Sequence, residues 1–323
     1  MNVSDACPAC GETARAVVRE YRSSQGQRFS YRECLVCGLQ RIDPWPDAAT
    51  LAAAYSERYY GGGTTKFVRV LEFLRNAFCR LRVRRVLRES GISRGHVLDI
   101  GCGNGKFLEL MSQAGWEISG TEIRGTAYAR AEKVAGIHLY PVEEGMRLPL
   151  ADASVDVVTI WHVLEHVSDP KALLAECRRV MKEGGMLLVE VPNVGSWQAR
   201  WSGRKWFHLD PPRHFYEFTD ASLRRMLDQA GFTGGRAGTL SLEMGIYGFA
   251  QSLMNLIVPR RDVLYSALIR GGGERYPAYL KLLSAALFVA ILVPSFALAL
   301  IESCFRSGAV LRITCKPERP LSA

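Results

Sequence analysis

Three glycines at alternate positions form the segment of this sequence best suited to chemistry. Gly101, Gly103 and Gly105 follow a short apolar run and precede a helical pattern. Glycines here remove the β-carbons that would hold the backbone away from a ligand, and they allow the positive φ values of a tight strand-to-helix turn. Glu122 ends a second strand-like run about twenty residues later, where a carboxylate can accept hydrogen bonds from both ribose hydroxyls of an adenosine. The pattern predicts a turn that binds an adenosine-containing cofactor.

The spacing of the glycines distinguishes two kinds of cofactor. A dinucleotide-binding turn follows G-x-G-x-x-G, because its third glycine lets the helix pack on the strand while the helix N-terminus faces a pyrophosphate. This chain has G-x-G-x-G, followed by Lys106. We therefore favour a cofactor without a phosphate over the nicotinamide dinucleotide of a dehydrogenase.

The turn and three further segments resemble the class I S-adenosylmethionine-dependent methyltransferases. Residues 148–158 are similar to the family's LPF-D-S-FD-V segment, 161–167 to its LEHV segment, and 181–189 to its glycine turn into the fifth strand. The resemblance covers about residues 95–240 and implies S-adenosylmethionine as the methyl donor. The residues that it assigns to the cofactor are Asp99, Gly101, Cys102, Gly103, Gly105, Glu122, Ile123, Glu144, Gly145 and Trp161.

Two histidine-containing segments could supply the base that methyl transfer to a hydroxyl requires. His162, Glu165 and His166 follow the fourth expected strand, whose carboxyl end borders the substrate crevice in open α/β sheets. A base and a structural or metal-assisting role are alternatives for these three. His214 lies in a Pro-Arg-His-x-Tyr-x-Phe-Thr segment, which resembles one in zinc-ribbon methyltransferases of sugar and glycan pathways. We prefer His214 as the base, the alternative being a histidine that caps a loop or a helix start.

Four of the nine cysteines form two C-x-x-C pairs, each followed by a glycine. They are Cys7, Cys10, Cys34 and Cys37. Four thiolates at this spacing surround one tetrahedral ion, and no further ligand is needed. The N-terminus has no pattern of a secretory signal, so we expect reduced thiols rather than disulfides. The sequence predicts a closed structural zinc site.

Strand and helix patterns alternate through the central part of the chain. Strands are expected near residues 97–100, 117–122, 137–141, 155–160 and 185–191, with helices near 105–114, 125–135, 170–182 and 219–230 and closing strands at 238–242 and 309–315. This alternation is typical of a parallel sheet between helix layers. The predicted fold class is α/β, a doubly wound Rossmann-like sheet with an N-terminal zinc ribbon and an apolar helical insertion before the last strand.

The insertion holds about twenty consecutive uncharged residues at 282–301, enough to cross a bilayer core. One crossing would put the last strand on the wrong side, so we expect a hairpin with a helix at 244–258 that dips into one leaflet, flanked by cations. A hydrophobic lid or a dimer interface on a soluble enzyme is the alternative.

The length of 323 residues exceeds that of a usual single domain. The predicted domains are a zinc ribbon at 1–45, a linker with a basic amphipathic helix at 46–94, the methyltransferase core at 95–242 and 309–318, and the apolar insertion at 243–308.

The formal net charge is +9, and many of the cations lie between Lys66 and Arg88. Such a helix suits a membrane surface, an acidic substrate or nucleic acid, or it is a solvated helix that packs on the sheet.

We predict a cytoplasmic enzyme, peripheral at the inner leaflet, that methylates a sugar, a glycan or a lipid-linked small molecule such as a lipid-linked saccharide. One alternative is an rRNA methyltransferase with zinc-ribbon RNA recognition, which the apolar insertion disfavours because RNA binding needs a long cationic face. The other is a non-catalytic zinc-ribbon and membrane scaffold, which the intact glycines and Glu122 disfavour. The sequence does not name the acceptor atom.

Overall fold

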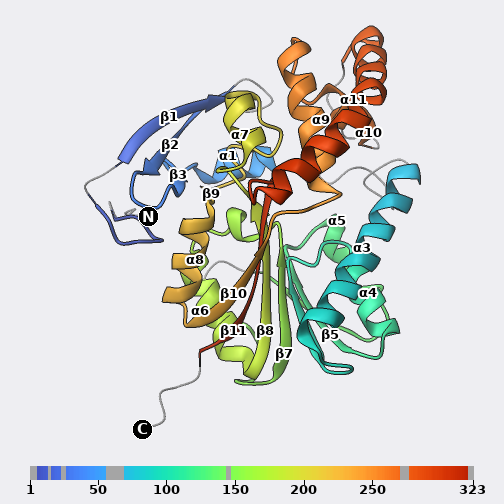
Figure 1. Cartoon of the computed structure of the whole chain (residues 1–323). Coiled ribbons are helices and arrows are strands. Elements are labelled where there is room, and N and C mark those ends of the chain that lie inside the picture. Colours follow the sequence, from blue (N-terminus) through green and yellow to red (C-terminus); the bar gives the residue numbers. More distant parts are fainter. Residues whose placement is uncertain are drawn as a thin grey trace. The chain divides into compact units, whose positions relative to one another are not determined.

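The chain divides into two compact units in the computed structural model (Figure 1). The described residues are 6–13, 16–22, 27–55, 69–142, 147–269 and 276–318. The first unit comprises Met1–Arg69, Val191–Arg225 and Gly238–Leu311, and the second comprises Val70–Glu190, Met226–Ala237 and Arg312–Ala323.

A seven-stranded sheet lies almost entirely in the second unit. In spatial order its strands are β10 (Phe232–Gly238), β11 (Val310–Pro317), β8 (Met181–Pro192), β7 (Val155–Trp161), β4 (His96–Ile100), β5 (Glu117–Glu122) and β6 (Ile137–Pro141). The pairs β7–β8, β4–β7, β4–β5 and β5–β6 are parallel. The strand order reverses beside β4, and ligands of open α/β sheets bind beyond the carboxyl ends of the strands at such a point. The predicted α/β fold with a mostly parallel central sheet is confirmed.

Helices cover both faces of this sheet. Figure 1 shows α3 (Arg69–Ser90) and α4 (Lys106–Gln113) on one side and α6 (Pro170–Val180) on the other. All five residues of β4 are buried, as expected for a strand covered on both faces. The N-cap residue of α6 is Asp169, whose side chain accepts a hydrogen bond from the backbone N of Ala172. The remaining helices of this region are α5 (Thr126–Ala131), η1 (Leu164–His166) and α8 (Asp220–Gln229), whose first half belongs to the first unit.

The basic helix expected before the sheet is α3. Its Val83 and Val86 are buried in the same core cluster as Leu108 of α4 and Ile118 of β5. The structure therefore agrees with the alternative in which this helix packs on the sheet, leaving cations such as Arg84 exposed.

One predicted closing strand is misplaced. The sequence predicted a strand at residues 238–242, whereas β10 spans Phe232–Gly238. Only Phe232 of β10 is buried, and three of its seven residues are glycines, so it lacks the apolar alternation that marks a strand. An edge position in the sheet tolerates such a sequence because only one side is paired.

A four-stranded sheet lies in the first unit. Its strands are β1 (Ala16–Arg22), β2 (Arg28–Cys34), β3 (Gln40–Ile42) and β9 (Tyr216–Glu217), and each neighbouring pair is antiparallel. In the last pair Gln40 lies opposite Glu217. A segment far along the chain thus completes the N-terminal sheet.

The other elements of the first unit are helical. They are α1 (Ala48–Ala54), α7 (Trp197–Ser202), η2 (Gly203–Lys205), α9 (Met244–Ile257), α10 (Val263–Leu268) and α11 (Ala278–Cys304). Figure 1 shows α9 beside α11. Within the described ranges α11 is the helix long and apolar enough to cross a membrane, with a mean hydropathy of 2.4. The apolar helix predicted before the last strand is therefore present.

Candidate active site

The glycine turn leaves room for a ligand at its middle position. Gly101, Gly103 and Gly105 have φ values of +68°, +60° and +75°, the left-handed region that the spacing predicted. A Cβ at Gly101 would lie 2.5 Å from Cγ2 of Val163, and one at Gly105 would lie 2.9 Å from Cγ2 of Val134. A Cβ at Gly103 would meet nothing within 4 Å. The outer glycines therefore allow packing, and the middle one faces open space.

Glu122 ends β5 beside this turn. Its Oε2 accepts a hydrogen bond from the backbone N of Gly103 at 2.7 Å, and its Oε1 accepts one from the N of Ile123 at 3.0 Å. Burial raises the pKa of Glu122, and these two backbone donors only partly offset that effect. The carboxylate and the glycine backbone therefore form one polar cradle, a donor and acceptor set that fits an adenosine ribose.

Asp99 and Cys102 contact the strands that support the turn. Asp99 is buried and accepts a hydrogen bond from Oγ1 of Thr159 at 2.6 Å. Burial raises its pKa to about 7, although the Thr159 hydrogen bond acts in the opposite direction. The Cys102 backbone N donates to the carbonyl of Thr121 at 2.9 Å, which ties the turn to β5. Glu144 and Gly145, which the resemblance assigned to the cofactor, lie outside the described residues.

Trp161, the last residue of β7, is fixed between two helices. The Arg82 guanidinium of α3 lies 4.8 Å from the centre of the indole ring, and the ring of Phe107 in α4 lies 6.1 Å away, edge to face. Trp161 is almost fully buried. Its Nε1 has no hydrogen-bond partner among the residues that the structure describes. The indole is thus packed on both sides, and its N–H group makes no hydrogen bond to a described residue.

His162 lies between two buried carboxylates. Its Nε2 is 3.1 Å from Oε1 of Glu190, and its Nδ1 is 3.7 Å from Oε1 of Glu165. Burial alone would lower the pKa of His162, but Glu165 and Glu190 outweigh burial and raise it to about 9. Arg312 of β11 donates to the other oxygen of Glu190 at 2.7 Å. Despite its burial, the pKa of Glu190 is therefore held well below its ordinary value by His162 and Arg312.

This arrangement bears on the predicted catalytic roles. The structure brings His162 and Glu165 together. Glu165 lies in the short helix η1, and the half-buried His166 is the last residue of that helix. A histidine with a pKa near 9 is already protonated at neutral pH and is poorly suited to accept a proton. The geometry favours a structural role for His162, one of the two alternatives that the sequence left open.

His214 is held by a different carboxylate, in the first unit. Its Nδ1 lies 2.9 Å from Oε1 of Glu217, the second residue of β9, and both side chains are buried. The Tyr31 hydroxyl donates to the backbone carbonyl of His214 at 2.7 Å, so the four-stranded sheet of the first unit, called the ribbon sheet from here on, fixes the main chain as well. The structure thus places the preferred base in a histidine–glutamate pair.

Glu190 and Arg312 were missed by sequence reasoning. Each is a charged residue inside an otherwise apolar strand segment, at 186–191 and 309–313. A charge at a buried strand position requires a partner, and that requirement was the available signal.

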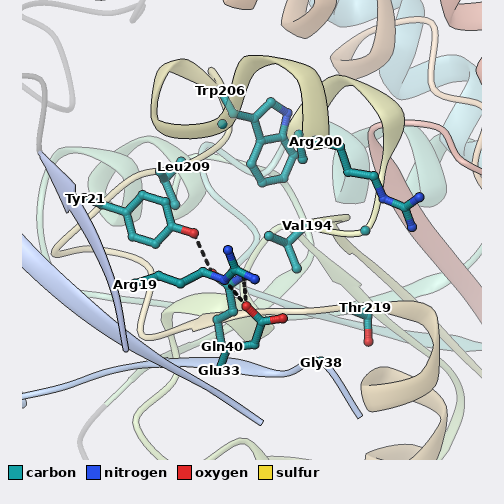
Figure 2. Close-up of a pocket in the computed structure, with 13 residues that line it drawn as sticks. Arg19, Tyr21, Glu33, Gly38, Gln40, Val194, Arg200, Trp206, Leu209 and Thr219 are labelled. Atoms are coloured by element: carbon teal, nitrogen blue, oxygen red, sulfur yellow. Dashed lines mark hydrogen bonds and ion pairs between the residues drawn. The ribbon is translucent and has the colours of Figure 1, made fainter. Parts of the chain in front are cut away.

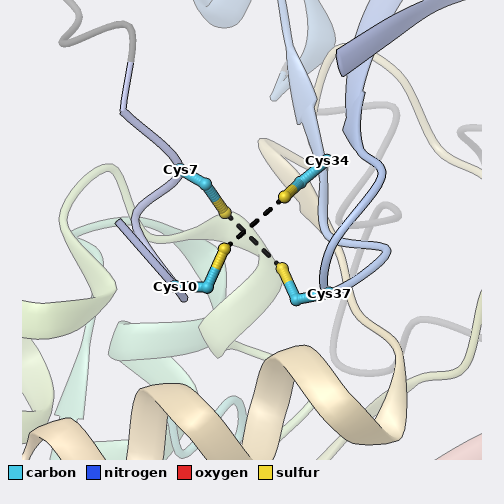
Figure 3. Close-up of side chains that lie close together, drawn as sticks. All are labelled: Cys7, Cys10, Cys34 and Cys37. Carbon is cyan, nitrogen blue, oxygen red and sulfur yellow. Dashed lines mark hydrogen bonds between the residues drawn. The ribbon is translucent and has the colours of Figure 1, made fainter. Parts of the chain in front are cut away.

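The four N-terminal cysteines converge on one point (Figure 3). The Sγ atoms of Cys7 and Cys37 are 3.6 Å apart, those of Cys10 and Cys34 are 3.5 Å apart, and all four lie within 4.8 Å of one another. A tetrahedral zinc ion with Zn–S bonds of about 2.3 Å would give S···S separations of roughly 3.8 Å. The donor set and its spacing therefore fit zinc.

The first unit also contains a cavity of about 400 Å³ (Figure 2). One wall is polar: the Tyr21 hydroxyl donates to Oε1 of Gln40 at 3.1 Å, and Glu33 accepts hydrogen bonds from Gln40 and Arg19. Burial raises the pKa of Tyr21 to about 12, so the phenol remains a donor at neutral pH. The apolar part of the lining is Val194, Ala199, Trp206 and Leu209.

Comparison with known proteins gives the family. Residues 70–234, just over half of the chain, match the family described as methyltransferase domain. A ubiquinone biosynthesis O-methyltransferase of Thiobacillus denitrificans is 31% identical over 166 residues, which are 47% of this chain and 70% of the relative. A probable S-adenosylmethionine-dependent methyltransferase of Mycobacterium tuberculosis is 36% identical over 141 residues, 42% of this chain and 48% of the relative.

The chain spans about half the length of most of the curated relatives that it matches. Among solved structures, a SAM-dependent methyltransferase from Archaeoglobus fulgidus is similar, with 21% identity, a TM-score of 0.47, and coverage of 84% of this chain and 100% of that one.

The family match includes the glycine turn, Glu122 and the segment from Trp161 to His166. It therefore favours an enzyme over the scaffold alternative. The chain belongs to the methyltransferase-domain family of S-adenosylmethionine-dependent methyltransferases, with S-adenosylmethionine as its methyl donor.

Proposed function

We propose that this methyltransferase transfers its methyl group to a hydroxyl of a small acceptor that carries a lipid tail. The observation that carries the proposal is the buried pair of His214 and Glu217, with 2.9 Å between Nδ1 and Oε1. A hydroxyl must lose its proton as it attacks the methyl group. A carboxylate that accepts the Nδ1 proton selects the tautomer whose lone pair is on Nε2, which makes that nitrogen the proton acceptor.

The donor site is assigned to the cradle of the second unit. S-adenosylmethionine supplies a methyl group activated by its sulfonium. Glu122 holds the ribose hydroxyls, Gly103 gives the backbone room to approach, and Asp99 supports the turn from behind. The open space at Gly103 and the position of Glu122 at the end of β5 support this assignment. Ile123 and Trp161 complete the described part of the proposed donor site, and Glu144 and Gly145 are assigned by resemblance alone.

The lipid tail of the acceptor has two kinds of support. Relatives from Thiobacillus denitrificans and Idiomarina loihiensis are named ubiquinone biosynthesis O-methyltransferases. In addition, α11 exposes large apolar side chains to solvent. These relatives are not named for sugars or glycans, so a lipid-linked phenol precedes a lipid-linked saccharide in our proposal.

The cysteine cluster is proposed to hold one structural zinc ion. Cys34 ends β2 and Cys37 lies between β2 and β3, and β3 pairs with β9 through Gln40 and Glu217. Oγ1 of Thr219 also donates to the carbonyl of Cys37 at 2.6 Å. The ion would therefore stabilise the sheet that carries Glu217.

The first experiment separates donor binding from proton transfer. Calorimetric titration with S-adenosylhomocysteine compares the wild type with Glu122→Ala and His214→Gln, and transfer is assayed with a polyprenylated phenol, a short-tailed phenol and a lipid-linked saccharide. We expect Glu122→Ala to lose binding and His214→Gln to keep binding but lose transfer. The matched control is His138→Gln at an exposed histidine of β6.

Each part of the proposal has its own contradicting result. Transfer by His214→Gln at the wild-type rate would exclude His214 as the base. Methylation of the saccharide but not of the phenols would replace the proposed acceptor. Undiminished binding to Glu122→Ala would contradict the donor site.

A further inference from the structure

Helix α11 presents its apolar side chains outward and its small or polar side chains inward. Its buried residues are Leu280, Ser284, Ser295, Ala299 and Glu302. The most exposed positions of its middle include Val289 and Val293, at 74% and 76% exposure. Only 17% of its most apolar stretch of 18 residues is buried. A helix that covers a soluble core has the opposite distribution, so the outward face of α11 requires an apolar environment.

Helix α9 is the inner partner of this helix. Of its residues, Gln251 and Asn255 are buried and joined by a hydrogen bond of 2.9 Å, and Asn255 also donates to the backbone carbonyl of Lys205 at 3.2 Å. A helix with buried amides and a length of only about 21 Å is a packed support, too short to cross a bilayer core of about 30 Å. The predicted pair of apolar helices therefore has one outward member, α11.

Two pairs of aromatic rings, of which Phe249 alone is buried, include the residue that follows the C-terminal end of α11. The rings of Trp197 in α7 and Phe305 are 5.1 Å apart, and those of Trp201 and Phe249 in α9 are 5.0 Å apart. Trp197 and Trp201 are 37% and 39% exposed. Indoles that are apolar on one side and wet on the other are typical of the boundary between lipid and water.

The segment that carries the two tryptophans also contains cations, and it contains no acidic residue. Residues 197–205 contain Arg200, Arg204 and Lys205 and no Asp or Glu. Within the described part of the chain, Arg200 and Arg204 make no ion pair with an acidic side chain. Both are exposed, and Lys205 is partly exposed. We call Trp197, Arg200, Trp201, Arg204 and Lys205 the aromatic–basic patch. Its composition is complementary to the head groups of anionic phospholipids.

We propose that the outward face of α11 and the aromatic–basic patch dock the enzyme on a bilayer that contains anionic phospholipids, with α11 immersed on one side of the membrane. The sheet topology excludes a single crossing, because the chain leaves the sheet after β10 and returns at the neighbouring strand β11. The role of docking, which is access to a lipid-tailed acceptor, rests on the proposed function. Docking itself is measured without catalysis.

The test is sedimentation of the full chain with vesicles of phosphatidylcholine alone or mixed with phosphatidylglycerol. We expect the wild type to bind the mixed vesicles more tightly than the neutral ones, with binding that weakens as salt is added. The variant R200Q/R204Q/K205Q should bind mixed vesicles roughly 100-fold more weakly, because each cation near an anionic surface contributes about fivefold. It should bind neutral vesicles as the wild type does.

Two further variants test the apolar part. Val289→Ser with Val293→Ser should weaken binding to both kinds of vesicle, whereas the matched change Val18→Ser, at an exposed valine of β1, should not. The charge-matched control replaces the exposed cations Lys133, Lys171 and Arg225 by glutamine. Brominated phospholipids should quench the tryptophan fluorescence of the wild type, and Trp197→Phe with Trp201→Phe should remove most of that quenching. Titration with S-adenosylhomocysteine confirms that each variant is folded.

Three results would overturn the inference. The wild type could stay in the supernatant with mixed vesicles, the triple glutamine variant could bind them as tightly as the wild type, or Val289 and Val293 could be needed for a stable dimer that does not bind vesicles. Methylation of a short-tailed phenol without vesicle binding would reject docking and keep the proposed function. Vesicle binding without transfer to any hydroxyl would reject the proposed function and keep docking.

Discussion

Two histidines of this enzyme, one in each unit, each contact a buried glutamate and yet have different surroundings. His162 lies between Glu165 and Glu190, and Glu190 is in turn paired with Arg312. His214 is paired through Nδ1 with Glu217 on a strand of the ribbon sheet. The first arrangement stabilises a cation within the methyltransferase sheet, and the second orients a ring. The comparison teaches that the number of acids around a histidine, two at His162 and Glu217 at His214, separates a ring held as a cation from a ring that is oriented.

The largest expected difference is in turnover. His214→Gln should lower kcat by about 10³-fold, within the range for loss of a general base, whereas His162→Gln should lower it far less. Both should bind S-adenosylhomocysteine. Single-turnover assays with the phenolic acceptor measure the two rates. Equal losses in the two variants would remove the distinction between the histidines.

Removal of the proposed zinc ion should affect methyl transfer and donor binding unequally. The cysteine cluster adjoins the sheet that carries Glu217, so chelation or Cys37→Ser should lower methyl transfer by roughly 10²-fold, toward the level of His214→Gln. Binding of S-adenosylhomocysteine should be unchanged, because the proposed donor residues lie in the second unit. Cys304→Ser, at an exposed cysteine outside the cluster, is the matched control. A chelated enzyme that transfers at the full rate would separate zinc from the His214 pair.

The smallest expected effect is a pH-dependent loss of stability due to His162. Its folded-state pKa is raised from 6.5 to about 9, so the stabilisation is complete below 6.5 and is lost as the pH rises through 9. The free energy of unfolding should fall over this interval by at most about 3 kcal/mol. Glu190 acts in the opposite direction, since its depressed pKa gives a stabilisation that is lost on acidification below its ordinary 4.5.

Urea titrations at a series of pH values measure this dependence. His162→Gln should flatten the curve between pH 6.5 and 9, and the matched control is the exposed His138→Gln. An unaltered slope in His162→Gln would mean that other groups titrate in this range.

The proximity of the glycine turn and Glu122 was predictable from the sequence because that information is local. The glycine turn and Glu122 lie at the ends of consecutive parallel strands, and strand order brings them together. Pairs that depend on sheet register across long separations were not predictable in this way. Glu190 meets Arg312 only because β8 and β11 are neighbours, and Gln40 lies opposite Glu217 only because β9 joins the ribbon sheet.

The insertion was predictable in composition but not in orientation. Hydropathy identified a long apolar helix, and the structure adds that its inner stripe contains Ser284, Ser295 and Glu302. Buried amides of α9 were hidden from hydropathy in the same way, because a few polar residues scarcely change a window average. The edge strand β10 was displaced in the prediction since its glycine-rich sequence has no strand periodicity.

The connection between β10 and β11 has an evolutionary consequence. These strands are neighbours in the sheet, so a short hairpin could join them in place of the three helices α9, α10 and α11. Loop length between adjacent strands has a small entropic cost, and exchange of such a loop leaves the order of the sheet unchanged. The strand order of the sheet therefore sets no limit on the length of the insertion, whereas its buried contacts with residues 198–209, such as Gln198 with Glu302, do constrain its sequence.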